Sequence, residues 1–109
     1  MADPTPTSRH PYPAAQLGPT RVPGLARHLG FQLRAARVSA GLSPMRLAAR
    51  LGQGYTSVMA LERGQHSIST DQLVRYCAAV DADPTLVLSD ALAFLAHERR
   101  TDRERNRTE

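Results

Sequence analysis

The stretch LAARLGQGYTSVMALERG (residues 47–64) contains two short segments with apolar residues at helical spacing, joined by a turn with two glycines. Gly52 directly follows the first segment, where glycine commonly ends a helix in the left-handed conformation. Val58 and Leu61 stand three positions apart in the second segment, so they share one face of a helix. Gly64 ends that segment in the same way. The stretch therefore predicts two short helices that meet across a tight turn.

Helical spacing continues on both sides of this stretch. Leu29 and Leu33 repeat at four residues in the segment before it. Ser43 can cap the helix that leads into the stretch, and Ser69 with Gln72 forms a capping-box pattern for a later helix. No segment alternates with a period of two for long, so we expect no sheet. The expected fold is all-α, an orthogonal bundle of five helices over residues 25–40, 44–51, 55–63, 70–80 and 84–99.

Two terminal segments differ in composition from the expected bundle. Residues 1–23 hold six of the eight prolines and little apolar periodicity, which indicates a flexible, partly polyproline-II arm. Residues 98–109 mix both signs of charge and lack apolar anchors, so they are either a fraying helix end or a solvated tail. We therefore expect one domain, residues 24–97, between a flexible N-terminal arm and a charged C-terminal tail.

The composition argues against several classes of protein. The sequence contains no run of about 18 apolar residues that could span a membrane, and its N-terminus has no apolar signal core. The single cysteine, Cys77, excludes an internal disulfide, and the four histidines have no metal-ligand spacing. The sequence contains no paired carboxylates, no Ser-His-Asp order and no phosphate-binding glycine loop, so it does not suggest an enzyme. We expect a cytoplasmic protein with no metal and no cofactor.

The charge of the chain is unevenly distributed. The net charge is +4, with a pI near 10.2, and all fourteen basic residues are arginines. Residues 29–64 carry five arginines and one acidic residue, whereas residues 65–96 carry one arginine and four aspartates. A surface that only contacts water does not require basic and acidic residues to be separated in this way. The half that contains the quoted stretch is therefore expected to face a polyanion such as nucleic acid.

The quoted stretch also meets the spacing requirements of a helix-turn-helix. In that motif the second helix packs closely on the first and places its N-terminal residues in the major groove of DNA. The close contact needs a small residue in the first helix, and Ala48 fits. The turn needs a residue that tolerates unusual dihedral angles, and Gly52 fits. Val58 and Leu61 supply the apolar face that points inward.

Three segments resemble the phage-repressor and Cro type of helix-turn-helix protein, also called the xenobiotic-response-element family. They are LGFQLRAARVSAGLS (29–43), LAARLGQGYTSVMALERG (47–64) and VDADPTLVL (80–88), the last resembling the family's closing turn before helix five. The resemblance implies a lambda-repressor-like fold and binding of double-stranded DNA, usually as a homodimer. Most members are transcriptional regulators, which implies a repressor-like regulator here, and some are antitoxins.

The resemblance also implies roles for individual residues. It implies a buried salt bridge between Arg37 and Glu62 that ties the first helix to the third. It places Ser43 at the cap of the second helix and Ser57 close to a phosphate or base. The positive half of the chain adds further phosphate contacts from arginines and from the loop that contains His66. The candidate DNA-binding residues are Ser43, Arg46, Arg50, Tyr55, Thr56, Ser57, Met59, Ala60, Arg63 and His66.

The expected recognition helix departs from the family pattern. Pro44 replaces a glutamine that often donates to a phosphate, and Gly54 replaces a capping serine or threonine. Met59 and Ala60 stand where polar base readers are usual, so contacts with thymine methyl groups and with the DNA backbone are expected. An alternative is a protein-interaction module or antitoxin on the same fold, in which an apolar recognition helix contacts a protein.

The fifth helix carries more apolar residues than one core-facing stripe needs. Leu86, Ala93 and Phe94 fall outside the stripe that can face the core. A helix that is apolar on more than one face is usually buried on both, so these residues predict a homodimer interface. In the alternative, the extra face packs under the first helix or under the N-terminal arm.

Overall fold

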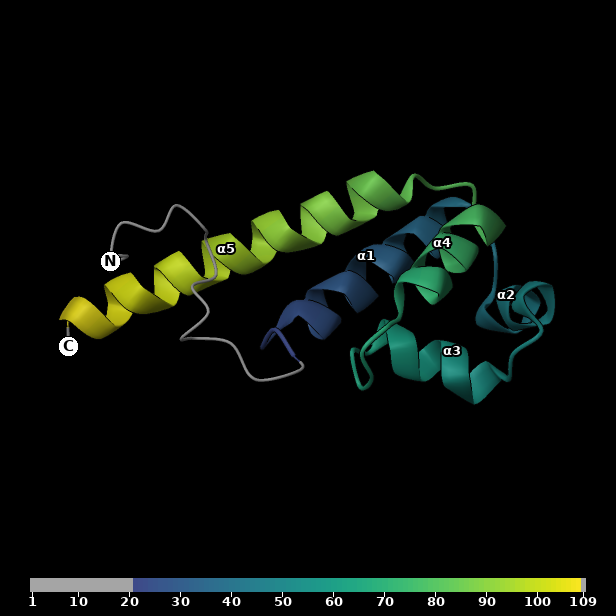
Figure 1. Ribbon diagram of the computed structural model, residues 1–109, viewed down its shortest axis with the longest axis horizontal. Helices are drawn as coiled ribbons and strands as arrows, with labels where there is room; N and C mark the ends of the chain where they lie inside the picture. Colours follow the sequence, from purple (N-terminus) through teal and green to yellow (C-terminus); the bar gives the residue numbers. More distant parts are fainter. Residues whose placement is uncertain (1–20, 109) are drawn as a thin grey trace, which may run out of the picture.

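The computed structural model describes residues 21–108 of the chain. Within this range the chain forms five helices and no strand, which confirms the predicted all-α bundle (Figure 1). The predicted N-terminal arm lies outside the described residues, apart from residues 21–23. The helices are α1 (Leu25–Ser39), α2 (Pro44–Leu51), α3 (Tyr55–Glu62), α4 (Thr70–Ala79) and α5 (Pro84–Thr108).

The helix ends follow from local sequence chemistry. Ser43 caps α2, because its hydroxyl accepts a hydrogen bond from the backbone N–H of Arg46 at 3.2 Å. Ser69 and Gln72 form a complete capping box at the start of α4, with distances of 3.1 and 3.0 Å. Gly52 ends α2 with a φ of 66°, a left-handed conformation that glycine adopts without steric cost. These caps mark both ends of α2 and the start of α4, close to the predicted positions.

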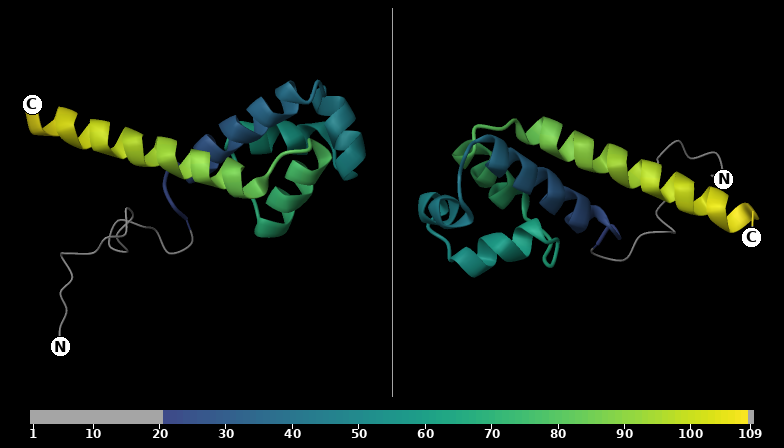
Figure 2. Two further views of the ribbon diagram at one scale, coloured as in Figure 1. Left: turned by 90° about the horizontal axis from the view of Figure 1, so that it is seen from above. Right: turned by 180° about the vertical axis from the view of Figure 1, so that it is seen from behind.

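The core lies where α1 meets the other helices. The α1 and α5 helices lie side by side in opposite directions over most of the length of α1 (Figures 1 and 2). Val87 and Ala91 of α5 are buried in the same apolar cluster as Leu33 of α1 and Tyr76 of α4. Cys77, beside Tyr76, is completely buried, as expected for a core thiol. Leucine, alanine and valine make up most of this cluster.

The fifth helix is longer than predicted. It continues to Thr108, whereas the sequence predicted an end near Arg99. Its C-terminal end projects beyond the start of α1 (Figure 2). The charged segment has no apolar stripe to predict a helix, but arginine and glutamate are good helix formers. Arg105 and Asp102 also form an ion pair at 2.6 Å across one turn.

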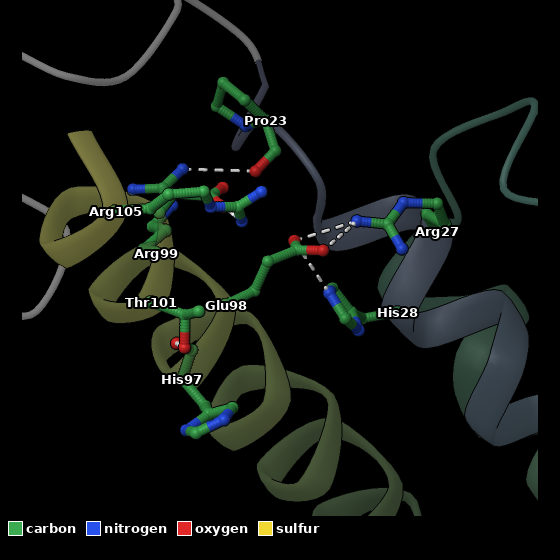
Figure 3. Close-up of polar contacts among 9 residues, drawn as sticks. Pro23, Arg27, His28, His97, Glu98, Arg99, Thr101 and Arg105 are labelled. Atoms are coloured by element: carbon green, nitrogen blue, oxygen red, sulfur yellow. Dashed lines mark hydrogen bonds and ion pairs between the residues drawn. The ribbon is translucent and has the colours of Figure 1, made fainter. Parts of the chain in front are cut away.

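Polar contacts fasten α5 to the beginning of α1 (Figure 3). The carboxylate of Glu98 accepts two hydrogen bonds from Arg27 Nη2, both at 2.8 Å. It also lies 3.1 Å from Nε2 of His28. Arg99 donates to the carbonyl of Pro23 at 3.1 Å, just before α1 begins. Glu98 and Arg99, at the start of the charged segment, therefore attach α5 to the N-terminal end of α1.

Candidate nucleic-acid interface

The α2 and α3 helices pack against each other across the Gly52 turn. Leu47 and Val58, one from each helix, are completely buried, and Ala48 is 4% exposed. The backbone N–H of Gln53 donates to the carbonyl of Ala48 at 3.0 Å, which closes the end of α2. The small side chain of Ala48 thus lies in the core beside the turn, as the helix-turn-helix spacing requires. The outer surface of α3 is left free to face solvent.

A buried polar network holds the C-terminal end of α3. The expected ion pair between Arg37 and Glu62 is present, with Nε to Oε2 at 2.7 Å and Nη2 to Oε1 at 3.0 Å. Both side chains are almost completely buried, and Arg37 also donates to the carbonyl of Leu42 at 2.8 Å. The hydroxyl of Tyr76 donates a short hydrogen bond to Glu62. One carboxylate on α3 therefore joins side chains from α1 and α4.

This network raises the pKa of Arg37 and of Tyr76. The hydrogen bond to Glu62 raises the pKa of Arg37 despite the opposing effect of burial. Burial, followed by the hydrogen bond to Glu62, raises the pKa of Tyr76 well above its usual range. The guanidinium therefore stays charged and the phenol stays protonated, so both remain donors. The part that Tyr76 plays could not be predicted from the sequence, because the spacing of apolar residues does not reveal a hydroxyl's partner.

Two glycines allow α1 to lie directly against the end of α3. A Cβ atom added at Gly30 would lie 2.5 Å from the carbonyl oxygen of Glu62. A Cβ atom at Gly64 would lie 2.5 Å from the Cα of Arg27, and Gly64 also has a φ of 73°. Any larger residue at these positions would force the two backbones apart. The angle at which α3 leaves the bundle therefore depends on this close contact.

The predicted site residues of α3 lie on two sides of the helix. Thr56 and Ser57 are exposed and border a hollow of about 290 Å³ beside the loop before α4. His66 lies in that loop and lines the same hollow. Met59 and Arg63 line a separate hollow of about 390 Å³ that faces α1. The first hollow is completed by Gln53, Ala60, Leu61, Ser67 and Gln72.

Two predicted contact residues are placed differently from the expectation. Ala60 is 8% exposed, because its small side chain lies at the edge of the core, so it offers little surface to a base. Arg50 points toward the far end of α4, where its Nη1 donates to the carbonyl of Ala79 at 3.0 Å. Arg75 of α4 makes the converse contact with the carbonyl of Leu51 at 3.0 Å. Arg50 thus helps to cap α4, a use that the charge count could not distinguish from phosphate binding.

A comparison with protein-family models identifies the chain. The model described as a helix-turn-helix domain matches residues 28–89, which include most of α1, all of α2 to α4 and the start of α5. The chain belongs to the helix-turn-helix domain family. This result agrees with the resemblance that the sequence predicted.

Solved structures with a similar fold support this assignment of the helix-turn-helix domain. The clp gene regulator ClgR from C. glutamicum is 30% identical, with a TM-score of 0.62 over 66% of this chain and 94% of that one. The restriction-modification controller protein C.AhdI from Aeromonas hydrophila is 32% identical, with a TM-score of 0.53 over 58% and 94%. The hypothetical transcription factor NHTF from Neisseria is 29% identical, with a TM-score of 0.55 over 64% and 82%. The comparison with curated proteins gave no match.

The helix-turn-helix domain also exposes apolar residues that sequence reasoning did not assign to the site. Met45, in the first turn of α2, is 68% exposed, and Phe31 of α1 is 62% exposed. Phe31 borders the hollow that contains Met59 and Arg63. The sequence could have indicated that Phe31 is exposed, since it falls outside the apolar stripe of Leu29 and Leu33. Met45 carried no comparable signal.

The outer face of α5 is exposed within the described chain. Leu86 is 60% exposed and Phe94 is 54% exposed, and Ala93 is exposed between them. The alternative in which this face packs under α1 does not hold, since Val87, Ala91 and Leu95 fill the core instead.

No helix within residues 21–108 is long and apolar enough to cross a membrane.

Proposed function

We propose that this helix-turn-helix domain regulates transcription by placing the exposed surface of α3 in the major groove of double-stranded DNA. The supporting observation is the start of α3, where Tyr55, Thr56 and Ser57 are all exposed. Their N-cap, Gly54, has no side chain to cover the first turn. The recognition helix of this motif contacts bases with its N-terminal residues. The membership in the family and the similarity to transcription regulators point in the same direction.

The proposed base contacts are a hydrogen bond from Thr56 and an apolar contact from Met59 with a thymine methyl group. Ser57 and Tyr55 are suited to nearby bases or phosphates, because their hydroxyl groups are exposed. Ala60 takes no part in this proposal because it is buried. With no bidentate pair to guanine or adenine, direct reading of sequence should be modest.

Phosphate binding is assigned to the cap of α2 and to the end of α3. Ser43 and Arg46 stand at the start of α2, where the positive end of the helix dipole favours an anion. Arg63 and His66 are exposed at and after the end of α3. Arg50 is left out, because it is bound to α4. The DNA surface thus combines few base contacts with a larger share of backbone contacts.

The test begins with selection of bound fragments from genomic DNA, followed by affinity measurements on a recovered site. Thr56→Ala and Met59→Ala should each weaken binding about fivefold, which corresponds to about 1 kcal/mol per contact. Arg46→Gln should lower the salt slope by about 0.9, the value for one lost phosphate contact. Arg50→Gln is the matched control on the same helix and should leave the slope unchanged.

Absence of binding to any fragment at about 50 mM salt would overturn the proposal, because non-specific DNA binding is strongest at low salt. That result would favour the alternative of a protein-interaction module or antitoxin on the same fold. Equal salt slopes for the Arg46 and Arg50 variants would contradict the assignment of the phosphate surface.

The regulator is further proposed to be a homodimer through the outer face of α5. Leu86, Ala93 and Phe94 are exposed apolar residues of α5, and burial of apolar surface favours association. Sedimentation at tens of micromolar should give twice the chain mass of 11.9 kDa. Phe94→Asp should give the monomer, while Val74→Asp on the exposed face of α4 should not. A monomeric wild-type protein would refute the interface.

A further inference from the structure

The face that α1 and α3 share includes residues that the proposed DNA contacts do not use. Arg27, Phe31 and Arg34 lie at spacings of four and three on α1, so they project from one side of that helix. Together with Met59 of α3 and Arg63, which directly follows α3, they border the hollow of about 390 Å³, here called the α1–α3 hollow. Apart from Glu62, its side chains are therefore three arginines and two apolar groups.

The α1–α3 hollow presents a positive charge to its surroundings. Glu62 also borders it, but its carboxylate already accepts hydrogen bonds from Arg37 and Tyr76 and is 2% exposed. Arg27 forms an ion pair with Glu98, which offsets its positive charge. Arg34 and Arg63 have no acidic partner or hydrogen-bond acceptor within residues 21–108. Two guanidinium groups are therefore available to an incoming anion.

The apolar part of the hollow is equally without a partner. Phe31 is 62% exposed and does not belong to the core cluster. Met59 is half-buried beside it. Aromatic residues, methionine and arginine are the types enriched in protein–protein interfaces, and aromatic residues dominate their binding energy. The fold of α1 does not require a phenylalanine at this position.

We infer that the α1–α3 hollow is a docking site for an acidic peptide segment of a partner protein. An apolar side chain of that segment would rest on Phe31 and Met59, and its carboxylates would pair with Arg34 and Arg63 in the bidentate geometry that guanidinium favours. A DNA backbone or a free phosphate ion would satisfy the arginines but leave the phenyl ring in water. A peptide that carries both kinds of group matches the whole surface.

This docking site goes beyond the proposed function and has a consequence for it. Met59 and Arg63 are assigned both to the DNA surface and to the α1–α3 hollow. A peptide bound there would occupy side chains that DNA needs. The acidic partner should therefore compete with DNA and release the regulator from its site.

The test uses a phage-displayed library of random peptides against the full chain. Selection should enrich peptides in which Asp or Glu stands beside Leu, Phe or Met. The synthetic form of an enriched peptide should bind Phe31→Ala at least about tenfold more weakly than wild type, as for an interface hot spot. Arg34→Gln should also weaken it. Val74→Ala removes a similarly exposed apolar side chain from α4 and should bind the peptide normally.

Several outcomes would overturn the inference. They are no enrichment, enrichment of peptides without acidic residues, and equal affinity of the peptide for wild type and Phe31→Ala. If Phe31→Ala and Arg34→Gln weaken DNA binding and no peptide is selected, the face belongs to the DNA interface instead. Because the selection contains no DNA, peptide binding by a chain that fails to bind DNA would sink the proposed function alone.

Discussion

Replacement of Glu62 by alanine removes the group that connects three helices. In the folded protein its carboxylate accepts hydrogen bonds from Arg37 at 2.7 and 3.0 Å and from the hydroxyl of Tyr76. After Glu62→Ala, Arg37 keeps the carbonyl of Leu42 but has lost its counter-ion inside the protein. The side chain of Arg37 is 8% exposed, so water cannot replace the carboxylate without rearrangement.

The expected loss follows from this burial. Removal of one partner of a buried pair costs about 3–5 kcal/mol, because the remaining charge is desolvated and unpaired. A domain of this size has a total stability of about 5–15 kcal/mol, so the variant should still fold but melt much earlier. We expect a loss of about 3 kcal/mol, the lower end of that range, because Arg37 retains one acceptor.

Urea denaturation followed by circular dichroism measures this loss. Glu62→Gln keeps the shape and one acceptor, so its stability should lie between those of wild type and Glu62→Ala. Asp102→Ala is the control, since it breaks an exposed pair, and its effect should be below about 1 kcal/mol. A loss of a few tenths of a kcal/mol for Glu62→Ala, equal to that of Asp102→Ala, would refute the reasoning.

Three further predictions concern other parts of the fold. Gly30→Ala should destabilise by about 1–3 kcal/mol in thermal melts, because the clash with the α3 backbone outweighs the gain of about 1 kcal/mol in helix propensity; a more stable variant would contradict this close contact. The pKa of Glu98 is held below its usual range by Arg27 and then His28, so its contribution is complete above about pH 4.3 and is lost as the pH falls through its folded pKa. The difference in melting temperature between wild type and Glu98→Gln should therefore shrink below that pH, and a constant difference would count against the contact. Burial raises the pKa of the Cys77 thiol, so a thiol reagent should modify it no faster than the protein unfolds; immediate reaction in the native state would show that the core is open.

Local rules in the sequence were sufficient for most of the fold. Ser43, Gly52 and the pair Ser69–Gln72 are caps, and a cap acts on backbone groups within four residues of itself. Their positions therefore predicted both ends of α2 and the start of α4. The C-terminal end of α5 could not be placed in this way, because its charged residues show no apolar period even though they favour a helix.

For the candidate site, too, the local sequence predicted some features and helix packing decided the others. The sequence by itself determined which residues belong to α3, because Gly52, Val58 and Leu61 define its turn and its inner face. Only the tertiary structure decided that Ala60 is buried, that Arg50 is bound to α4, and that Phe31 of α1 lies beside Met59 of α3. The physical reason is range: caps and apolar periods act within one helix, whereas exposure and charge pairing depend on which helices pack together.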